Sequence, residues 1–232
     1  MALFCPKCGG LNPPGADWCK HCGTYHSFDG DAGVDAGAYP EGNDGEAPKL
    51  LTAPRADMPY MPYEKPREGQ EGIIRDMLAA LDSGRHIVAE SGTGTGKTIV
   101  SLAAALQHSI PRGKRVLYLT RTISQTDQVM RELRNISTVT PVTGIALTGR
   151  KKSCLLIRGR EGYEEISPQA LSSICEDSKR NVKEGKPNAC PYFARMPARM
   201  EEVKQYFMRE IPTSGDLDAY CESVKVCPYE TK

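Results

Sequence analysis

The sequence SGTGTGKT, residues 91–98, decides how the chain around it folds. Its glycines allow successive backbone N–H groups to turn toward one point, and a Gly-Lys-Thr ending follows them. A short apolar run, His86–Ala89, precedes this turn, and a helical pattern, Thr98–His108, follows it. A glycine-rich turn between a buried strand and a helix is the context that a phosphate-binding P-loop requires, since the helix N-terminus also favours an anion.

The chemistry of this loop predicts that the chain binds ATP with Mg²⁺. Lys97 would place its charge at the β- and γ-phosphates, and the Thr98 hydroxyl would be a ligand of Mg²⁺, which makes these two the candidate catalytic residues. The strict motif has glycine six residues before the lysine, where this chain has Ser91. The candidate nucleotide-binding residues of the loop are Ser91, Gly92, Thr93, Gly94, Thr95, Gly96, Lys97 and Thr98.

Gln70 stands 27 residues before the P-loop lysine, at the start of a predicted helix. A side-chain amide offers one donor and one acceptor, which suits the edge of an adenine base. A glutamine at the start of a helix can equally be a plain surface residue. Its place upstream of a P-loop keeps Gln70 as a further candidate for nucleotide binding.

The pattern on both sides of the loop predicts an α/β fold with a parallel, doubly wound sheet. Helices are expected over Gly69–Ser83 and Ser124–Arg134, with Ser124 as a possible N-cap, and strands over Arg115–Leu119 and Thr143–Leu147. This order of strands and helices is typical of a doubly wound sheet. After residue 150 the alternation stops, and only short helical stretches such as Pro197–Glu210 remain, which indicates a separate insertion.

The length and local composition of the chain predict that it divides into four segments. The chain has 232 residues, enough for one α/β domain of about 150 residues with one or two small modules. Residues 1–26 form a cysteine-rich unit, 27–57 a flexible linker rich in Gly, Asp, Ala and Pro, 58–150 the nucleotide-binding part and 151–232 the insertion. No apolar run approaches the roughly 20 residues that span a bilayer, and no secretory signal begins the chain, so we expect a cytoplasmic protein without a membrane partner.

The chain has a net charge of +1, but its charged residues are unevenly distributed along the sequence. Residues 111–160 contain eleven Lys and Arg against two acids, whereas residues 27–57 contain seven acids. The basic block could face phosphates. Solvated helix faces would give the same count, so charge alone does not decide between these interpretations.

The four front cysteines form two Cys-x2-Cys pairs. Each pair is followed by glycine, and ten residues separate the pairs. Four thiolates at this spacing suit tetrahedral Zn²⁺, and a unit this small needs a metal to fold. A rubredoxin-like iron site is the alternative, and the zinc ribbon could dock a protein partner, bind nucleic acid or serve only as a tether. The candidate zinc ligands are Cys5, Cys8, Cys19 and Cys22.

Five cysteines in residues 151–232 lack this paired spacing, and disulfides are improbable in a cytosolic chain. Two of them open Cys-Pro-Tyr segments. Single cysteines from separate segments suit a [4Fe–4S] cluster, although five unrelated thiols would look the same. The five are Cys154, Cys175, Cys190, Cys221 and Cys227.

Taken together, these segments resemble the XPD/Rad3 family of iron–sulfur superfamily 2 DNA helicases over residues 60–232. The matching segments are Arg67-Glu68-Gly69-Gln70, the P-loop, Leu117–Thr122, Gly149–Cys154 and the two Cys-Pro-Tyr segments. The basic segment that leads into Cys154 is the most specific of them. The P-loop also resembles that of the DinG relatives, whose cysteine spacing fits less well.

The resemblance implies an ATP-dependent DNA helicase of 5′→3′ polarity that acts on single-stranded or forked DNA, and we expect a monomer. It implies a RecA-like domain with an inserted α-helical iron–sulfur domain beside the strand-separation point. By position, Cys154, Cys175, Cys190 and Cys227 match the cluster ligands, and Cys221 is spare or replaces a neighbour. Arg121 and Thr122 match contacts to the single strand, and Arg150 matches a basic residue tied to the cluster region and to DNA binding.

Two parts of such a helicase have no counterpart in the sequence: the DEAH box and the second RecA-like domain. Asp216-Leu217-Asp218 does not replace the DEAH box, because no buried apolar strand precedes it. We therefore expect the front portion of a longer helicase, which binds nucleotide but lacks the parts for hydrolysis. The alternatives are a P-loop ATPase with zinc modules that is not a helicase, and a non-enzymatic metal-binding fragment.

Overall fold

The computed structural model describes residues 3–4, 11–12, 48–92 and 94–232. The chain divides into two units, Met1–Lys49 and Leu50–Lys232. In the first unit, strands β1 (Leu3–Phe4) and β2 (Leu11–Asn12) pair antiparallel. The four front cysteines lie outside the described residues, so the zinc ribbon remains a prediction.

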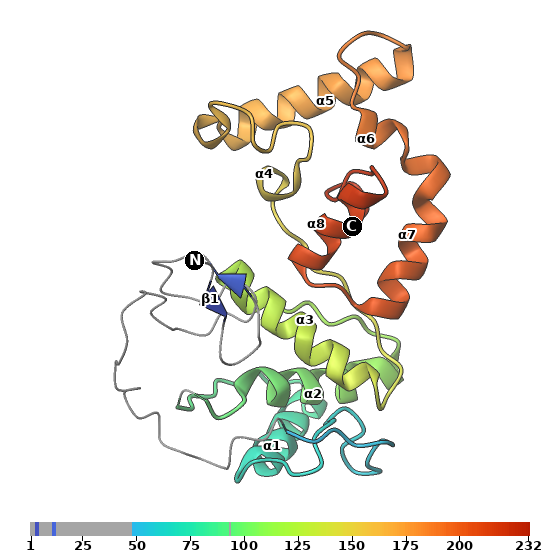
Figure 1. Cartoon of the computed structure of the whole chain (residues 1–232). Helices are drawn as coiled ribbons and strands as arrows, with labels where there is room; N and C mark the ends of the chain where they lie inside the picture. Colours follow the sequence, from blue (N-terminus) through green and yellow to red (C-terminus); the bar gives the residue numbers. More distant parts are fainter. Residues whose placement is uncertain (1–2, 5–10, 13–47, 93) are drawn as a thin grey trace. The chain divides into compact units, whose positions relative to one another are not determined.

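The second unit is helical (Figure 1). No helix in the part of the chain that the structure describes is long and apolar enough to cross a membrane. In chain order, its helices are α1 (Gln70–Asp82), α2 (Lys97–Ser109), the 3-10 turn η1 (Ile110–Arg112), α3 (Ile123–Ser137), α4 (Arg150–Ser153), the 3-10 turn η2 (Tyr163–Glu165), α5 (Pro168–Glu184), α6 (Pro191–Ala194), α7 (Met196–Glu210) and α8 (Ser214–Ser223).

The four helices predicted from the sequence are confirmed within a few residues at each end, as α1, α2, α3 and α7. The proposed cap of α3 is wrong, because Thr122 occupies that position. Its hydroxyl accepts from the Gln125 amide, and the Gln125 side chain accepts in return from the amide of Thr122. Gln125 stands three residues after Thr122 and completes this box, whereas Asp127, three residues after Ser124, accepts from the amide of Ser214 instead.

The parallel sheet is unconfirmed. Between residues 48 and 232, apart from the undescribed residue 93, the structure has a single bridge, Leu50 with Tyr63, and no strand. In the segment expected as a strand over Arg115–Leu119, burial of the side chains still alternates. Tyr118 packs against the core, whereas Leu117 and Leu119 are 77% and 80% exposed. Parallel strands are normally buried on both faces, and among the described residues only one face of this segment is covered.

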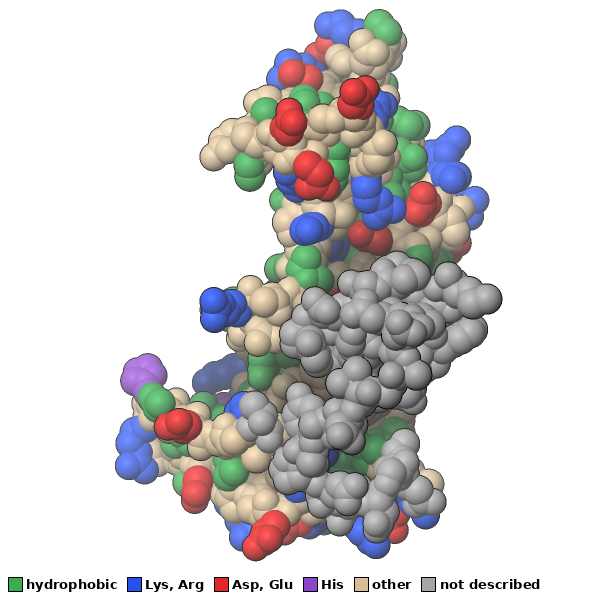
Figure 2. Space-filling view, turned by 60° about the vertical axis from the view of Figure 1, so that its left-hand side comes forward, with side chains coloured by type: hydrophobic (Ala, Val, Ile, Leu, Met, Phe, Trp, Pro, Cys, Tyr) green, Lys and Arg blue, Asp and Glu red, His purple; other side chains and the backbone are tan. Residues whose placement is uncertain are grey.

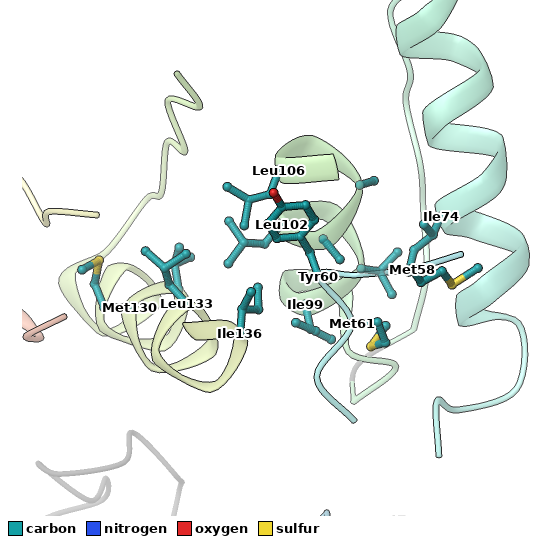
Figure 3. Packing of buried hydrophobic residues seen from close by; sticks show 14 of the residues in the cluster. Met58, Tyr60, Met61, Ile74, Ile99, Leu102, Leu106, Met130, Leu133 and Ile136 are labelled. Atoms are coloured by element: carbon teal, nitrogen blue, oxygen red, sulfur yellow. The ribbon is translucent and has the colours of Figure 1, made fainter. Parts of the chain in front are cut away.

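The core around the P-loop lies between α1, α2 and α3 (Figure 3). Ile74 of α1, Leu102 of α2 and Ile136 of α3 are at most 3% exposed. The hydroxyl of Tyr118 lies 2.9 Å from that of Ser101 on α2. Since the Ser101 hydroxyl donates to the carbonyl of Lys97, Tyr118 donates to Ser101, which ties this segment to the start of α2.

An extended segment before α1 completes this core. Met58, Tyr60 and Met61 insert between the helices and are almost fully buried (Figure 3). Immediately upstream, the Arg55 guanidinium pairs with Glu71 of α1 at 2.7 Å, and Gln107 donates to the Asp57 carbonyl. Residues 50–57, assigned to the flexible linker from the sequence, therefore pack on the nucleotide-binding part.

A second core forms from α7, α8 and the segment after them. Its buried members are Met196, Val203, Leu217, Cys221 and Val226. Helix α3 joins it to the first core. The Arg134 guanidinium donates to the carbonyls of Glu210 and Ile211 and pairs with Asp216 at 2.8 Å, and Asp127 accepts from the amide of Ser214 at 2.9 Å.

Candidate functional site

The P-loop turns through two glycines with positive φ, Gly94 at 79° and Gly96 at 80°. Gly96 is followed at once by α2, whose first residue is Lys97. The Lys97 ammonium folds back over the loop and donates to the carbonyls of Ser91, at 2.8 Å, and Gly92. The loop thus places an exposed lysine, a helix N-terminus and a glycine turn at one point, which is what binding of a polyphosphate requires.

Gln70 is 4% exposed and lies directly behind this loop. Its side-chain oxygen accepts from the Arg67 amide at 2.9 Å, and its side-chain nitrogen donates to the Thr95 carbonyl at 2.8 Å. A Cβ added at Gly96 would stand 2.4 Å from that nitrogen. Both polar atoms of the amide are therefore engaged with backbone, and glycine at position 96 is what allows the close approach.

Arg121 and Thr122 lie at the entry to α3. Both are exposed, and the Thr122 hydroxyl is used as the helix cap. In the view of Figure 2, Lys and Arg side chains of the described residues are interspersed with Asp and Glu. Arg121 is the member of the block that the α3 entry presents to solvent.

The rear cysteines predicted as ligands come together. Cys154, Cys175, Cys190 and Cys227 line one cavity, and apolar side chains that include Leu155, Leu171 and Ile174 complete its lining. They reach it from four separate segments: the end of α4, the middle of α5, the start of α6 and the turn after α8. Burial raises the pKa of the Cys175 and Cys190 thiols. It raises the pKa of the Cys227 thiol to about 11.

No three His, Cys, Asp or Glu side chains of the described residues are grouped tightly enough to hold a single metal ion. The cysteine cavity therefore gathers its four thiols without converging them on one ion position. The donor set is nevertheless made of thiols alone, the ligand that iron–sulfur clusters use.

Cys221 does not line the cavity. It is fully buried in the second core, and its sulfur lies 3.8 Å from the Thr231 hydroxyl. Burial raises its pKa to about 11. Cys221 is thus the rear cysteine that does not line the cavity, although Cys227 packs against the same core.

Arg150 lies in the wall of the cavity. Its guanidinium carbon is 4.6 Å from the centre of the Tyr229 ring, and its Nε is buried with no hydrogen-bond partner in the described chain. Lys179 of α5 pairs with Glu230 at 2.9 Å nearby. Sequence reasoning missed this pair, although Lys179 follows Cys175 by one helical turn and Glu230 follows Cys227 by three residues.

Asp216 and Asp218 serve the fold. Both are on α8, where the Asp216 carboxylate accepts from the amide of the N-cap residue Thr213 and pairs with Arg134, and Asp218 pairs with Arg158 at 3.2 Å. Neither follows a strand beside the P-loop, as a DEAH-type aspartate would.

Comparison with known families finds two overlapping matches. Residues 118–232 match the DEAD_2 family, and residues 67–162 match the DEAD/DEAH box helicase family. Together the two matches extend from just before Gln70 to the last residue. They include the P-loop and all four cysteines of the cavity.

Individual relatives agree with these matches. The chain is 27% identical over 196 residues to the general transcription and DNA repair factor IIH helicase subunit XPD/RAD3 of Saccharomyces cerevisiae. It is 32% identical over 191 residues to the XPD subunit of Schizosaccharomyces pombe. Each alignment covers 75% of this chain and 24% of that relative, so the chain spans about a quarter of their length. A third relative is the ATP-dependent DNA helicase YoaA of Escherichia coli, 34% identical over 48% of this chain and 16% of that protein.

Proposed function

The chain belongs to the XPD/Rad3-like DEAD/DEAH box helicases, and we propose that it is the ATP-binding and cluster-binding part of an ATP-dependent DNA helicase. One observation carries the proposal: a single compact unit holds both a P-loop and a cavity lined by four cysteines. Either feature alone occurs in many proteins. Their combination in one unit, in the order of the matched families, favours a motor in which nucleotide turnover acts close to a metal cluster.

Within this part, Lys97 and Thr98 bind the nucleotide phosphates and Mg²⁺, with the backbone of residues 91–96 as the cradle. Binding requires the Lys97 ammonium to leave the Ser91 and Gly92 carbonyls and turn to the phosphates. Gln70 acts from behind by fixing the Thr95 carbonyl. Its near-complete burial favours this positioning role over direct pairing with adenine.

A [4Fe–4S] cluster held by Cys154, Cys175, Cys190 and Cys227 is part of this proposal, and it is supported by the shared cavity that these four thiols line. A four-iron cluster takes one thiolate at each iron, so its ligands stand further apart than those of a single ion. Four thiols from separate segments around one cavity support this assignment. When bound, the cluster would serve as a rigid covalent link between the four segments. Arg150, with its unpartnered Nε in the wall, would offset the negative charge of the thiolates.

The proposed substrate is single-stranded DNA, along which the helicase moves with 5′→3′ polarity. Arg121 at the start of α3 contacts its phosphates, and affinity falls as salt rises. The RecA-like parallel sheet is part of the same proposal. Leu117 and Leu119 are exposed on one face of their segment, and a parallel sheet with both faces covered would bury these side chains. The front cysteines bind Zn²⁺ and so form a zinc ribbon, with the ligands Cys5, Cys8, Cys19 and Cys22. This ribbon docks a protein partner. The helicase itself is a monomer in the cytoplasm.

The decisive experiment measures ATP hydrolysis by the full-length gene product with and without single-stranded DNA, together with its iron content. Stimulation by DNA and loss of turnover in Lys97→Ala support the helicase. A colourless protein with zinc in both cysteine groups and no response to DNA would instead support the P-loop ATPase with zinc modules.

A further inference from the structure

Lys179 and Glu230 form an ion pair beside the cysteine cavity without lining it. Their charged groups are 2.9 Å apart, and the two side chains are only 23% and 21% exposed. Lys179 stands one turn after Cys175 on α5, and Glu230 stands three residues after Cys227. The pair therefore joins two cysteine-bearing segments whose cysteines are far apart in the sequence.

The same lysine also contacts a third cysteine-bearing segment. Its ammonium lies 5.7 Å from the centre of the Phe193 ring, three residues after Cys190. The amide of Cys190 itself donates to the carbonyl of Ser178, the residue before Lys179, at 3.2 Å. Lys179 is thus the point at which the segments of Cys175, Cys190 and Cys227 meet.

We propose that Lys179 and Glu230 are a positioning pair that holds these three cysteines in place for the cluster. The inference rests on the cluster proposed above and adds residues that are not ligands. Loop closure over tens of residues opposes the approach of Cys227 to Cys175, and a contact that spans the two segments offsets this cost. An ion pair that is three-quarters buried is screened less by water than an exposed one, and removal of one partner leaves the other charge unpaired.

The test uses the whole chain, purified without oxygen, with iron and acid-labile sulfide measured per chain. The half-life of the cluster absorbance in air is the second readout. The variants are Lys179→Glu, Glu230→Lys and the double exchange, with Lys183→Glu as a matched control. Lys183 is exposed and lies one turn further along the same helix, so it changes the charge of α5 by the same amount.

We expect each single variant to bleach roughly five- to tenfold faster than the wild type, the scale of coupling between residues in contact. The double exchange should recover most of the half-life, and Lys183→Glu should match the wild type. Unchanged half-lives in both single variants, or a double exchange as labile as the singles, would overturn the proposal. Far-UV circular dichroism confirms that α5 is intact in each variant.

The iron content of the wild-type chain shows whether a negative result contradicts the cluster assignment or only the positioning role of the ion pair. If the wild-type chain holds no iron, the cluster assignment is wrong, and the alkylation rates of Cys190 and Cys227 then decide whether the pair positions them. Faster alkylation in both single variants, with recovery in the double exchange, would support positioning. Equal rates in all four proteins would overturn it.

Discussion

The side-chain amide of Gln70 donates to the main-chain oxygen of Thr95 across 2.8 Å, which fastens the start of α1 to the P-loop. The residues are 25 positions apart, and the bond sits against Gly96, the last residue before α2. A loop that must wrap around phosphates is entropically costly to order. The buried amide therefore acts as a preorganising contact for nucleotide binding.

Replacement of Gln70 by alanine should weaken ATP and GTP binding alike. Loss of one net hydrogen bond costs about 1 kcal/mol, which corresponds to roughly fivefold in affinity. Titration of the chain with both nucleotides measures the effect. A selective loss of ATP over GTP would instead show that Gln70 contacts adenine, and Gln128→Ala, a partly exposed glutamine on α3, is the control.

Replacement of Gly96 by alanine should damage the same contact from the other side. The new Cβ would meet the Gln70 nitrogen at 2.4 Å, on a backbone with φ of 80° that disfavours side chains. We expect a loss of nucleotide affinity larger than that of Gln70→Ala, with a destabilisation of about 1–3 kcal/mol. Chemical denaturation and nucleotide titration measure the two effects. Gly113→Ala, also at positive φ but with nothing within 4 Å of the added Cβ, separates strain from the clash.

Loss of the Lys97 ammonium should abolish measurable nucleotide binding and leave the fold intact. The lysine is exposed, and its two bonds are to loop carbonyls that water can satisfy. Lys97→Ala should therefore keep the thermal midpoint within a degree or two of the wild type, as exposed substitutions usually do. Lys114→Ala, an exposed lysine at a distance from the loop in sequence, should bind nucleotide normally. Undiminished binding in Lys97→Ala would contradict the P-loop assignment.

Serine at any of the four cavity cysteines should reduce iron content, whereas Cys221→Ala should keep it. Cys221 is buried in the second core and does not line the cavity, so its loss should cost about 1 kcal/mol of stability without removing a ligand. Iron, sulfide and zinc analysis of the five variants measures this difference. Loss of iron in Cys221→Ala at unchanged helicity would show that the ligand set is misassigned.

Arg134→Ala should loosen the contact between α3 and the corner that joins α7 to α8. Its guanidinium bonds two carbonyls and Asp216 there, and the partly exposed ion pair adds less than the bonds to backbone. We expect a destabilisation of about 1–2 kcal/mol, measured by urea unfolding. A variant as stable as the wild type would show that the two cores do not depend on this contact.

The helices and the P-loop were predictable because their signals are local. Apolar residues at helical spacing gave α1 and α2, and the Gly-Lys-Thr ending gave the loop. The same reasoning failed for the cap of α3, where the reciprocal box of Thr122 and Gln125 outcompetes Ser124. It left the sheet unconfirmed, since short apolar runs such as His86–Ala89 become strands only when neighbours cover them, and Val88 is 99% exposed here.

From the order of residues alone came the kind of chemistry: a phosphate loop at 91–98, thiols without paired spacing after residue 150, and a family resemblance that the comparisons bear out. Only the tertiary structure decided which thiols share a cavity, that Cys221 is not among them, and which backbone atoms Gln70 serves. Spacing along the chain encodes contacts within a few turns. Contacts such as that of Lys179 with Glu230, 51 residues apart, depend on how the packed helices close the loops between them.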